Sequence, residues 1–391
     1  MEKKFDLKGF LVKYTMVIIL IIVFLFFNQL TGGRMLYPQN LSNLLLQNAY
    51  VVILSCGMLL CILTGGNIDL AVGSVVCLVG AIAAQLTQKT SWGALPIILI
   101  GIFVGLLVGV WQGYWIGYQH IPPFVVSLAG MFVFRGIGRV VLDSKTVAVT
   151  NKTFLDIFTS YIAIPGLDDG TLKVSALIVG IASAVFLIAW STYKALKKKK
   201  LGYGSGSVSG AVIKSVIIGI AVCWYSYKLA CYKGIPVMLL WVLAIVAIYG
   251  YITSKTAFGR YFYAVGGNEK AAKLSGINTN KIYFSAYVSM SVLAALSGLL
   301  CAARIGSVNG DTGNSFEMDA IGSCFIGGAS AYGGTGTVGG AVIGAILMGI
   351  INQGMSIYGL NSNWQYVVKG AVLLLAVVFD IKVNNKDTAK A

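Results

Sequence analysis

The fold of this chain is decided by the stretch GIFVGLLVGVWQGYWIG, residues 101–117, which contains no charged residue. With the apolar residues before it, it forms a segment over 94–117, and about 20 such residues are enough for a helix to cross a lipid bilayer. Glycine recurs at every fourth position, which would place one straight stripe of small residues on a helix. The stripe consists of Gly101, Gly105, Gly109, Gly113 and Gly117. We therefore predict a membrane-spanning helix that packs closely against a second helix.

The whole chain shares this composition. Its 391 residues are 57% hydrophobic and 11% charged, and its mean hydropathy is +0.83. A soluble domain carries about 25% charged residues, and a membrane β-barrel would show short alternating segments instead of long apolar ones. The predicted fold class is therefore an all-α polytopic membrane protein.

Twelve apolar segments can be drawn along the chain, which predicts about twelve transmembrane helices in a single transmembrane domain over residues 1–391. Where two segments nearly meet, around residues 64–68 and 334–337, we expect broken or re-entrant helices. The expected spans are residues 14–30, 41–64, 68–87, 94–117, 122–142, 174–193, 211–230, 235–253, 282–302, 319–334, 337–353 and 364–380.

The distribution of basic residues predicts how the chain is oriented. Twelve crossings put both termini on one side, and that side receives eighteen of the 29 Lys and Arg residues, against nine on the other. Because cytoplasmic segments carry the excess of basic residues, both termini are predicted to be cytoplasmic. The same assignment makes residues 194–210, which contain KALKKKK, a basic cytoplasmic loop, and residues 254–281 a second cytoplasmic loop. The net charge of +16 thus indicates membrane topology and gives no reason to expect nucleic-acid binding.

Two pairs of motifs suggest that the chain contains an internal repeat. A second glycine series, Gly336, Gly340 and Gly344, repeats the four-residue spacing near the other end of the chain. The segments IDLAVGS (68–74) and MDAIGS (318–323) each place an acidic residue before an apolar run, with Gly-Ser soon after. Repeated halves with interrupted helices are typical of transporters, with the substrate path between the halves.

The sequence offers little to support catalysis or cofactor binding. GTGTVG (334–339) fits a dinucleotide-binding pattern, but it lies among membrane segments with no acid about 20 residues on. The chain has no phosphate-binding loop motif, one histidine, and seven cysteines without metal-ligand spacing. We expect a transport subunit that is not an enzyme and has no metal site and no cofactor of its own.

A small set of polar residues near span ends is the candidate for the translocation path. Acidic residues at membrane depth often serve transport, although these could also simply cap helices. With so few of them, the chain resembles a conduit without an energy source of its own. The candidates for the path or for helix breaks are Asn67, Asp69, Ser74, Glu317, Asp319 and Ser323.

One polar stretch, GGNEKAAKLS (266–275), is predicted to form a short cytoplasmic helix over 268–276. Asn268 is a good N-cap, Glu269 is favourable in the first turn, and Gly276 suits the C-terminal end. Ala271, Ala272 and Ser275 would form a small flat face on this helix. Such a face could dock into a groove on a partner, and an ordinary surface loop is the alternative.

In this stretch and in four others the chain resembles the permease subunits of bacterial sugar ABC importers of the ribose, galactose and xylose type. The additional pair of spans around 174–230 is similar to the longer xylose or multiple-monosaccharide branch. Ala71, Gly322 and Ser323 depart from the family pattern but remain small. The matching stretches are LTGGNIDLAVGS (63–74), FRGI (134–137), TAFGRYFYAVGGNEKAAKLSGIN (256–278), FEMDAIGSCFIGGASAYGGTGTVGG (316–340) and WQYVVKGAVLLLAV (364–377).

The resemblance implies an importer in the bacterial plasma (inner) membrane that carries xylose or a similar monosaccharide. A second permease copy would complete the path, an ATPase subunit holding ATP and Mg²⁺ would drive it, and an extracellular binding protein would deliver the sugar. The ATPase would contact Gly266, Gly267, Asn268, Glu269, Ala271, Ala272, Ser275 and Gly276. The binding protein would meet basic residues on the outer face, for which the candidates are Arg34, Arg139, Lys145 and Arg304.

Two other functions remain open at this point. An ion-coupled secondary sugar transporter would share the fold class but would move sugar without an ATPase. A membrane-bound enzyme would need a catalytic cluster, and the sequence shows none.

Overall fold

The structure is a computed structural model that describes residues 7–164, 166–168, 170–201 and 208–388. The described residues form fifteen α-helices, one short 3₁₀-helix and four two-residue strands, which confirms an all-α polytopic membrane protein. Nine of the helices are long and apolar enough to cross a membrane, and the apolar stretches Thr15–Leu30 and Ser362–Val378 are shorter.

The helices follow the expected spans in order. Along the chain they are α1 (Leu7–Leu30), α2 (Pro38–Leu63), α3 (Val72–Lys89), α4 (Ala94–Gly117), α5 (Pro123–Val141), α6 (Lys152–Thr159), α7 (Val174–Lys200), α8 (Val208–Ala230), α9 (Met238–Lys255), α10 (Ala257–Gly267), α11 (Glu269–Leu274), α12 (Thr279–Ile305), α13 (Phe316–Ile326), α14 (Val338–Tyr358) and α15 (Ser362–Thr388). The 3₁₀-helix η1 is Arg34–Leu36, and the strands are β1 (Val147–Ala148), β2 (Tyr161–Ile162), β3 (Ile235–Pro236) and β4 (Ser307–Val308).

The glycine stripe of α4 packs against α12, as its spacing predicts. A side chain at Gly109 would approach the Cα of Val288 to 2.7 Å, and one at Gly117 would approach the carbonyl oxygen of Asn280 to 2.7 Å. The two backbones therefore touch along most of their length. The core of the molecule lies around α12 and its neighbours α2 and α3, which are the most buried of the long helices.

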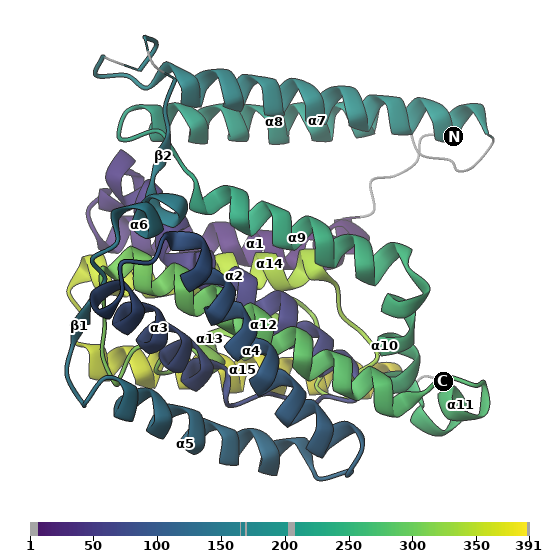
Figure 1. Ribbon diagram of the computed structural model, residues 1–391. Coiled ribbons are helices and arrows are strands. Elements are labelled where there is room, and N and C mark those ends of the chain that lie inside the picture. The colour runs from purple at the N-terminus through teal and green to yellow at the C-terminus, as the bar shows by residue number, and fades with distance from the viewer. Residues whose placement is uncertain (1–6, 165, 169, 202–207, 389–391) are drawn as a thin grey trace.

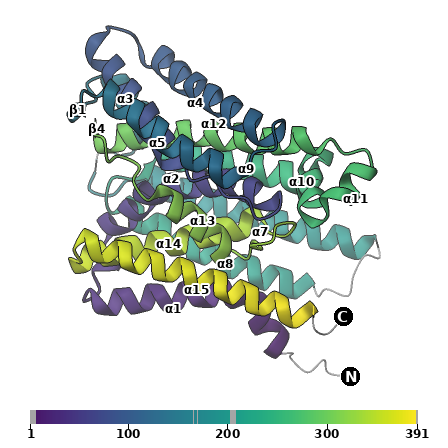
Figure 2. The same cartoon turned by 90° about the horizontal axis from the view of Figure 1, so that it is seen from below.

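The two ends of the molecule are built differently. At one end, β1 pairs with β4 and β2 pairs with β3, both antiparallel, and α6 lies beside them (Figure 1). At the other end lie α10 and α11, and this is also where α1 begins and α15 ends (Figures 1 and 2). We call these the strand end and the α11 end.

Both expected helix breaks are present, and one expected span is wrong. Residues 64–71 separate α2 from α3 without helix. The span expected over 319–334 is helical only as α13, which ends at Ile326, and residues 327–337 form turns and extended backbone. The physical reason is glycine: Gly328, Gly333, Gly334 and Gly336 all have positive φ, which a helix cannot use.

Two segments expected to be loops contain helix. The segment 194–210 is helical up to Lys200 because α7 continues through the lysine run, residues 202–207 lie outside the described residues, and α8 begins at Val208. The segment 254–281 contains α10 as well as the short helix. Unbranched Lys side chains favour helix, so a charged run can extend a membrane helix beyond its apolar part.

Helices α7 and α8 form a hairpin at the side of the body (Figure 1). They pair with each other along their length and reach the body mainly through α8 and α2. The hydroxyl of Tyr225 donates to the carbonyl oxygen of Leu41 at 2.8 Å and fixes one such contact.

Candidate translocation path and coupling helix

A buried ion pair joins α13 to α15. Lys369 Nζ lies 2.9 Å from Asp319 Oδ2, and the two side chains are 12% and 0% exposed. The Tyr50 hydroxyl donates to the same carboxylate at 3.1 Å, and Asn352 Nδ2 donates to its other oxygen at 3.4 Å. Asp319 thus ties together α2, α13, α14 and α15, and Ser323 donates to its backbone carbonyl one turn on.

The break between α2 and α3 contains two of the expected polar residues. Asn67 Nδ2 donates to the carbonyl oxygen of Thr64 at 3.1 Å and closes the turn. Asp69 is fully buried, and its Oδ1 accepts from the backbone N–H of Ala71 at 2.9 Å. Its Oδ2 has no partner within the described part of the chain. Asp69 therefore closes the turn that leads into α3, and it does not cap the helix, which has no side-chain cap at its N-cap residue Ala71.

A third polar group lies where α3, α5 and the segment before α13 meet. Arg135 on α5 donates to Ser74 Oγ at 3.3 Å and to the carbonyl oxygen of Gly310 at 3.1 Å. Close packing of α3 on this segment also brings Glu317 near, because a side chain at Gly73 would lie 2.5 Å from its Oε2. Of the six expected path residues, Ser74 and Glu317 lie at this meeting point. Asp319 and Ser323 lie further along α13, the helix that also contains Glu317. Asn67 and Asp69 lie in the break between α2 and α3.

The short helix at the α11 end matches the expected capping. Asn268 Oδ1 accepts from the N–H of Ala271 at 3.0 Å, and Gly276 has a φ of +83° just after the helix. The Tyr283 hydroxyl donates to Glu269 Oε2 at 3.1 Å and ties α11 to α12.

The expected docking face of this helix needs a correction. Ala272 is 5% exposed and packs into the core, so it faces away from any partner, while Ala271 and Ser275 are exposed. Leu274 is 90% exposed. The residues from Asn268 to Gly276 are too few to show amphipathic periodicity, so the sequence did not reveal which side points outward.

Helix α10 connects α11 to both helix breaks. A side chain at Gly266 would clash with the carbonyl oxygen of Leu63, the last residue of α2, and Gly267 lies against Gly334. The backbone N–H of Gly334 donates to the same Leu63 oxygen at 3.1 Å. The Tyr263 hydroxyl donates to the carbonyl oxygen of Gly336 at 3.0 Å. Helix α10, which directly precedes α11, therefore contacts both the end of α2 and the 327–337 segment.

The four basic residues expected on the outer face all belong to the strand end, in different settings. Arg34 is exposed on η1. Arg139 pairs with Asp311 at 3.1 Å and Lys145 pairs with Asp143, in both cases between exposed side chains. Arg304 is half-buried in the last turn of α12. The charges of Arg139 and Lys145 are thus partly balanced within the chain.

Two features of the site were missed by sequence reasoning. The sequence analysis did not pair Lys369 with Asp319, and it did not connect Arg135 with Ser74. A lone basic residue inside an apolar run was the available signal, because such a residue usually pairs with an acid on a neighbouring helix. Among the described residues, no group of three or more His, Cys, Asp or Glu side chains could hold a metal ion.

Comparison with known proteins decides the family. Residues 40–377 match the family model described as the permease component of branched-chain amino acid transport systems. The chain belongs to this permease family. The expectation of an ABC transporter permease is thereby confirmed, and the chain is a transport subunit and not a catalytic one.

Individual relatives cover nearly the whole chain. The xylose transport system permease protein of Haemophilus influenzae is 37% identical over 376 residues, 95% of this chain and 97% of the relative. That of Escherichia coli is 35% identical over 94% of this chain and 91% of its own length. The ribose import permease protein of Escherichia coli is 30% identical, covering 88% of this chain and 86% of the relative. No solved structure matches this permease at a significant level.

Proposed function

We propose that this permease forms the path by which xylose, or a closely similar monosaccharide, enters a bacterium through its plasma (inner) membrane. The observation that carries the proposal is the likeness to xylose permeases over almost the full length of both chains. Ribose permeases are also similar, but they are less identical and cover less of the chain. A pentose is therefore favoured as the substrate.

The described helices support a twelve-crossing arrangement. In this arrangement α13 and the 327–337 segment together make one broken crossing, and the other eleven are α1–α5, α7–α9, α12, α14 and α15. An even number of crossings agrees with α1 beginning and α15 ending at the same end of the molecule (Figure 2). The exposed lysines of α7 and α11 lie at that end, so we place the α11 end in the cytoplasm.

The internal repeat belongs to the same proposal. Asp69 and Asp319 each lie at the start of a helix that adjoins a break, α3 and α13 respectively. Helix α3 packs on α12 and helix α13 packs on α2, and α2 and α12 pack on each other. Two matching broken elements around a shared centre are what a repeated transporter half would produce.

Three partners complete the proposed importer. A cytoplasmic ATPase subunit would hold ATP and Mg²⁺ and contact α11, through Ala271 and Ser275 with Leu274 between them. A sugar-binding protein would deliver substrate at the strand end, where Arg34 and Arg304 are the basic candidates without an acidic partner among the described residues. A second copy of this chain would complete the path as a homodimer, which the many exposed apolar side chains on the long helices permit.

Uptake of labelled sugar tests the proposed substrate. The permease would be expressed, with an ATP-binding subunit and a sugar-binding protein from the same host, in a bacterium that lacks its own xylose transporters. We expect uptake of D-xylose that requires all three proteins. Uptake of another solute, with D-xylose neither carried nor competing, would overturn the assignment of a pentose.

A further inference from the structure

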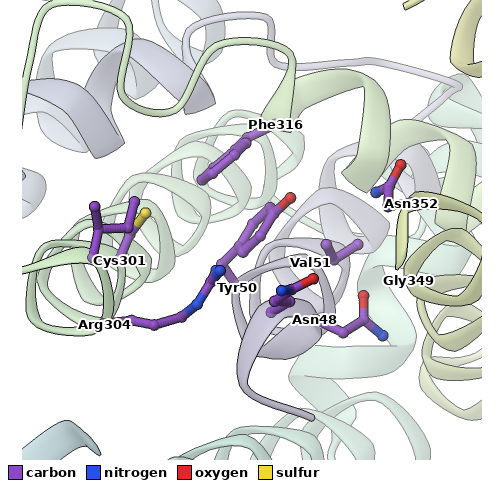
Figure 3. Close-up of a pocket in the computed structure, with 10 residues that line it drawn as sticks. Asn48, Tyr50, Val51, Cys301, Arg304, Phe316, Gly349 and Asn352 are labelled. Carbon is purple, nitrogen blue, oxygen red and sulfur yellow. The ribbon is translucent and has the colours of Figure 1, made fainter. Parts of the chain in front are cut away.

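A cavity of about 260 Å³ opens between α2, α12, α13 and α14 (Figure 3). It is smaller than the pockets of roughly 300–1,000 Å³ that hold drug-sized ligands. Its lining comes from α2 and from three helices much later in the chain, α12, α13 and α14, so it depends on the packed fold and not on one loop.

One side of the cavity is aromatic. The rings of Tyr50 and Phe316 stack with centroids 3.7 Å apart and planes 15° from parallel (Figure 3). The Tyr50 hydroxyl is held by Asp319, which fixes the orientation of the ring. An amphipathic aromatic surface of this kind suits a ligand that has both C–H faces and hydroxyl groups.

The other sides carry polar groups without partners. Asn48 is 5% exposed, and its carboxamide forms no hydrogen bond with any residue that the structure describes. Asn352 donates to Asp319, which leaves its buried Oδ1 unpartnered in the same set of residues. Buried polar atoms almost always have a hydrogen-bond partner. A ligand or water must therefore supply the missing partners.

Asn48 is held in place by packing, and Arg304 is free to donate. A side chain at Gly349 would collide with the carboxamide of Asn48, so the glycine allows Asn48 to lie directly on the backbone of α14. Arg304, at the rim, forms no ion pair or hydrogen bond within the described residues and is free to donate. The cavity thus offers two amide groups, Asn48 and Asn352, and a cation with several donors.

We propose that this cavity is a low-affinity subsite for a neutral monosaccharide on its way through the permease. Tyr50 and Phe316 contact a face of the sugar ring, while Asn48, Asn352 and Arg304 exchange hydrogen bonds with its hydroxyls. Each sugar hydroxyl can donate and accept, which matches a mixture of amide and guanidinium groups. The inference rests on the proposed function for its choice of ligand.

The test is saturation-transfer difference NMR on the purified permease with D-xylose, D-ribose and D-galactose, since this method detects weak binding. We expect transfer from the wild-type protein to D-xylose. Asn48→Leu and Arg304→Gln should each lower the transfer about five- to tenfold, the effect of losing one hydrogen bond. Arg304 lies at the rim, so Arg304→Gln keeps the test valid should Asn48→Leu not fold.

Asn28→Leu is the matched control, because Asn28 also has a buried, unpartnered Oδ1 among the described residues but lies on α1, away from the cavity. It should leave the transfer unchanged. No transfer to any of the three sugars, or equal transfer with wild type and both variants, would mean that the cavity holds ordered water only. The cell-uptake experiment can fail independently, because it depends on the partner subunits and this one does not.

Discussion

Lys369 lies within an apolar helix, and among the described residues its charge is balanced by Asp319 alone. Removing one partner of a buried pair costs about 3–5 kcal/mol, because the remaining charge is left without compensation. We therefore expect Lys369→Met to destabilise the permease by about that amount. Combining Asp319→Asn with Lys369→Gln should recover a large part of the loss. Thermal unfolding of the wild type and of these two purified variants measures this, and a double variant no more stable than Lys369→Met would contradict the pairing.

Asp168, in the segment between β2 and α7, provides a prediction about pH. Its carboxylate accepts the N–H groups of Ile164 at 2.7 Å and Ser175 at 3.0 Å. Hydrogen bonds from Ser175 first, and then from Ile164, hold the pKa of Asp168 below its usual value of 3.8. A lowered pKa in the folded protein stabilises the fold above the unfolded pKa, and this contribution is lost as the pH falls through the folded value.

The measurement for Asp168 is hydrogen exchange of residues 161–175 at pH values from 6 down to 3. We expect protection to fall only below about pH 4, the ordinary range of an aspartate. In Asp168→Asn the protection should be lower throughout and should not change with pH. Loss of protection with the same pH profile in the variant would show that another group is responsible.

At this scale the sequence predicted residue types better than residue contacts. Asn268, Glu269 and Gly276 were placed correctly at the ends of α11, since capping depends on near neighbours in the chain. Asp319 and Lys369 lie 50 positions apart, and their pairing depends on the packing of α13 against α15. No local pattern contains that information.

Among the elements, α4 and α12 depend on the absence of side chains between them. A side chain at Gly105 would approach the carbonyl oxygen of Ser291 to 2.9 Å and also meet Ala295. Gly105→Ala should therefore destabilise the protein by about 1–3 kcal/mol. Gly136→Ala is the control, because nothing lies within 4 Å of that position, and it should be neutral or stabilising by up to about 1 kcal/mol. Equal unfolding temperatures for the two variants would show that the helices are not packed in this way.

The short helix α11 gives a prediction about assembly. Leu274 is 90% exposed and makes little contact with its own chain, so Leu274→Ser should leave the fold intact. If α11 docks into the ATPase subunit, the variant should retain less than about a tenth of the wild-type ATPase on co-purification, because a buried leucine contributes about 1.5–3 kcal/mol. Leu201→Ser, which removes an exposed leucine at the end of α7, is the matched control. Full retention by Leu274→Ser would show that α11 is not the contact.

Ala272→Glu, which the sequence alone would suggest for the same purpose, is a poor test. Ala272 is buried, and an unpaired carboxylate there would disturb the core. The difference between Ala272 and Leu274 shows where sequence reasoning stopped: it located the helix but not its outward side.

For the molecule as a whole, apolar length and spacing were enough to place eleven of the twelve predicted segments as helices in the right order, since each helix satisfies its own backbone hydrogen bonds in lipid. The exception was 319–334, where apolar composition continues but glycines with positive φ end the helix after Ile326. The cavity beside Tyr50 could not be predicted, because it requires four helices to be packed before it exists.

The central claim is that this permease carries sugar only as the passive subunit of an ATP-driven importer, and uptake into proteoliposomes tests it most directly. Vesicles would contain the permease alone, or the permease with its ATPase subunit, with the binding protein and labelled D-xylose outside. The account predicts accumulation only when the ATPase and internal ATP are both present, and none under a proton or sodium gradient without them. Gradient-driven accumulation by the permease alone would contradict the account and identify a secondary carrier.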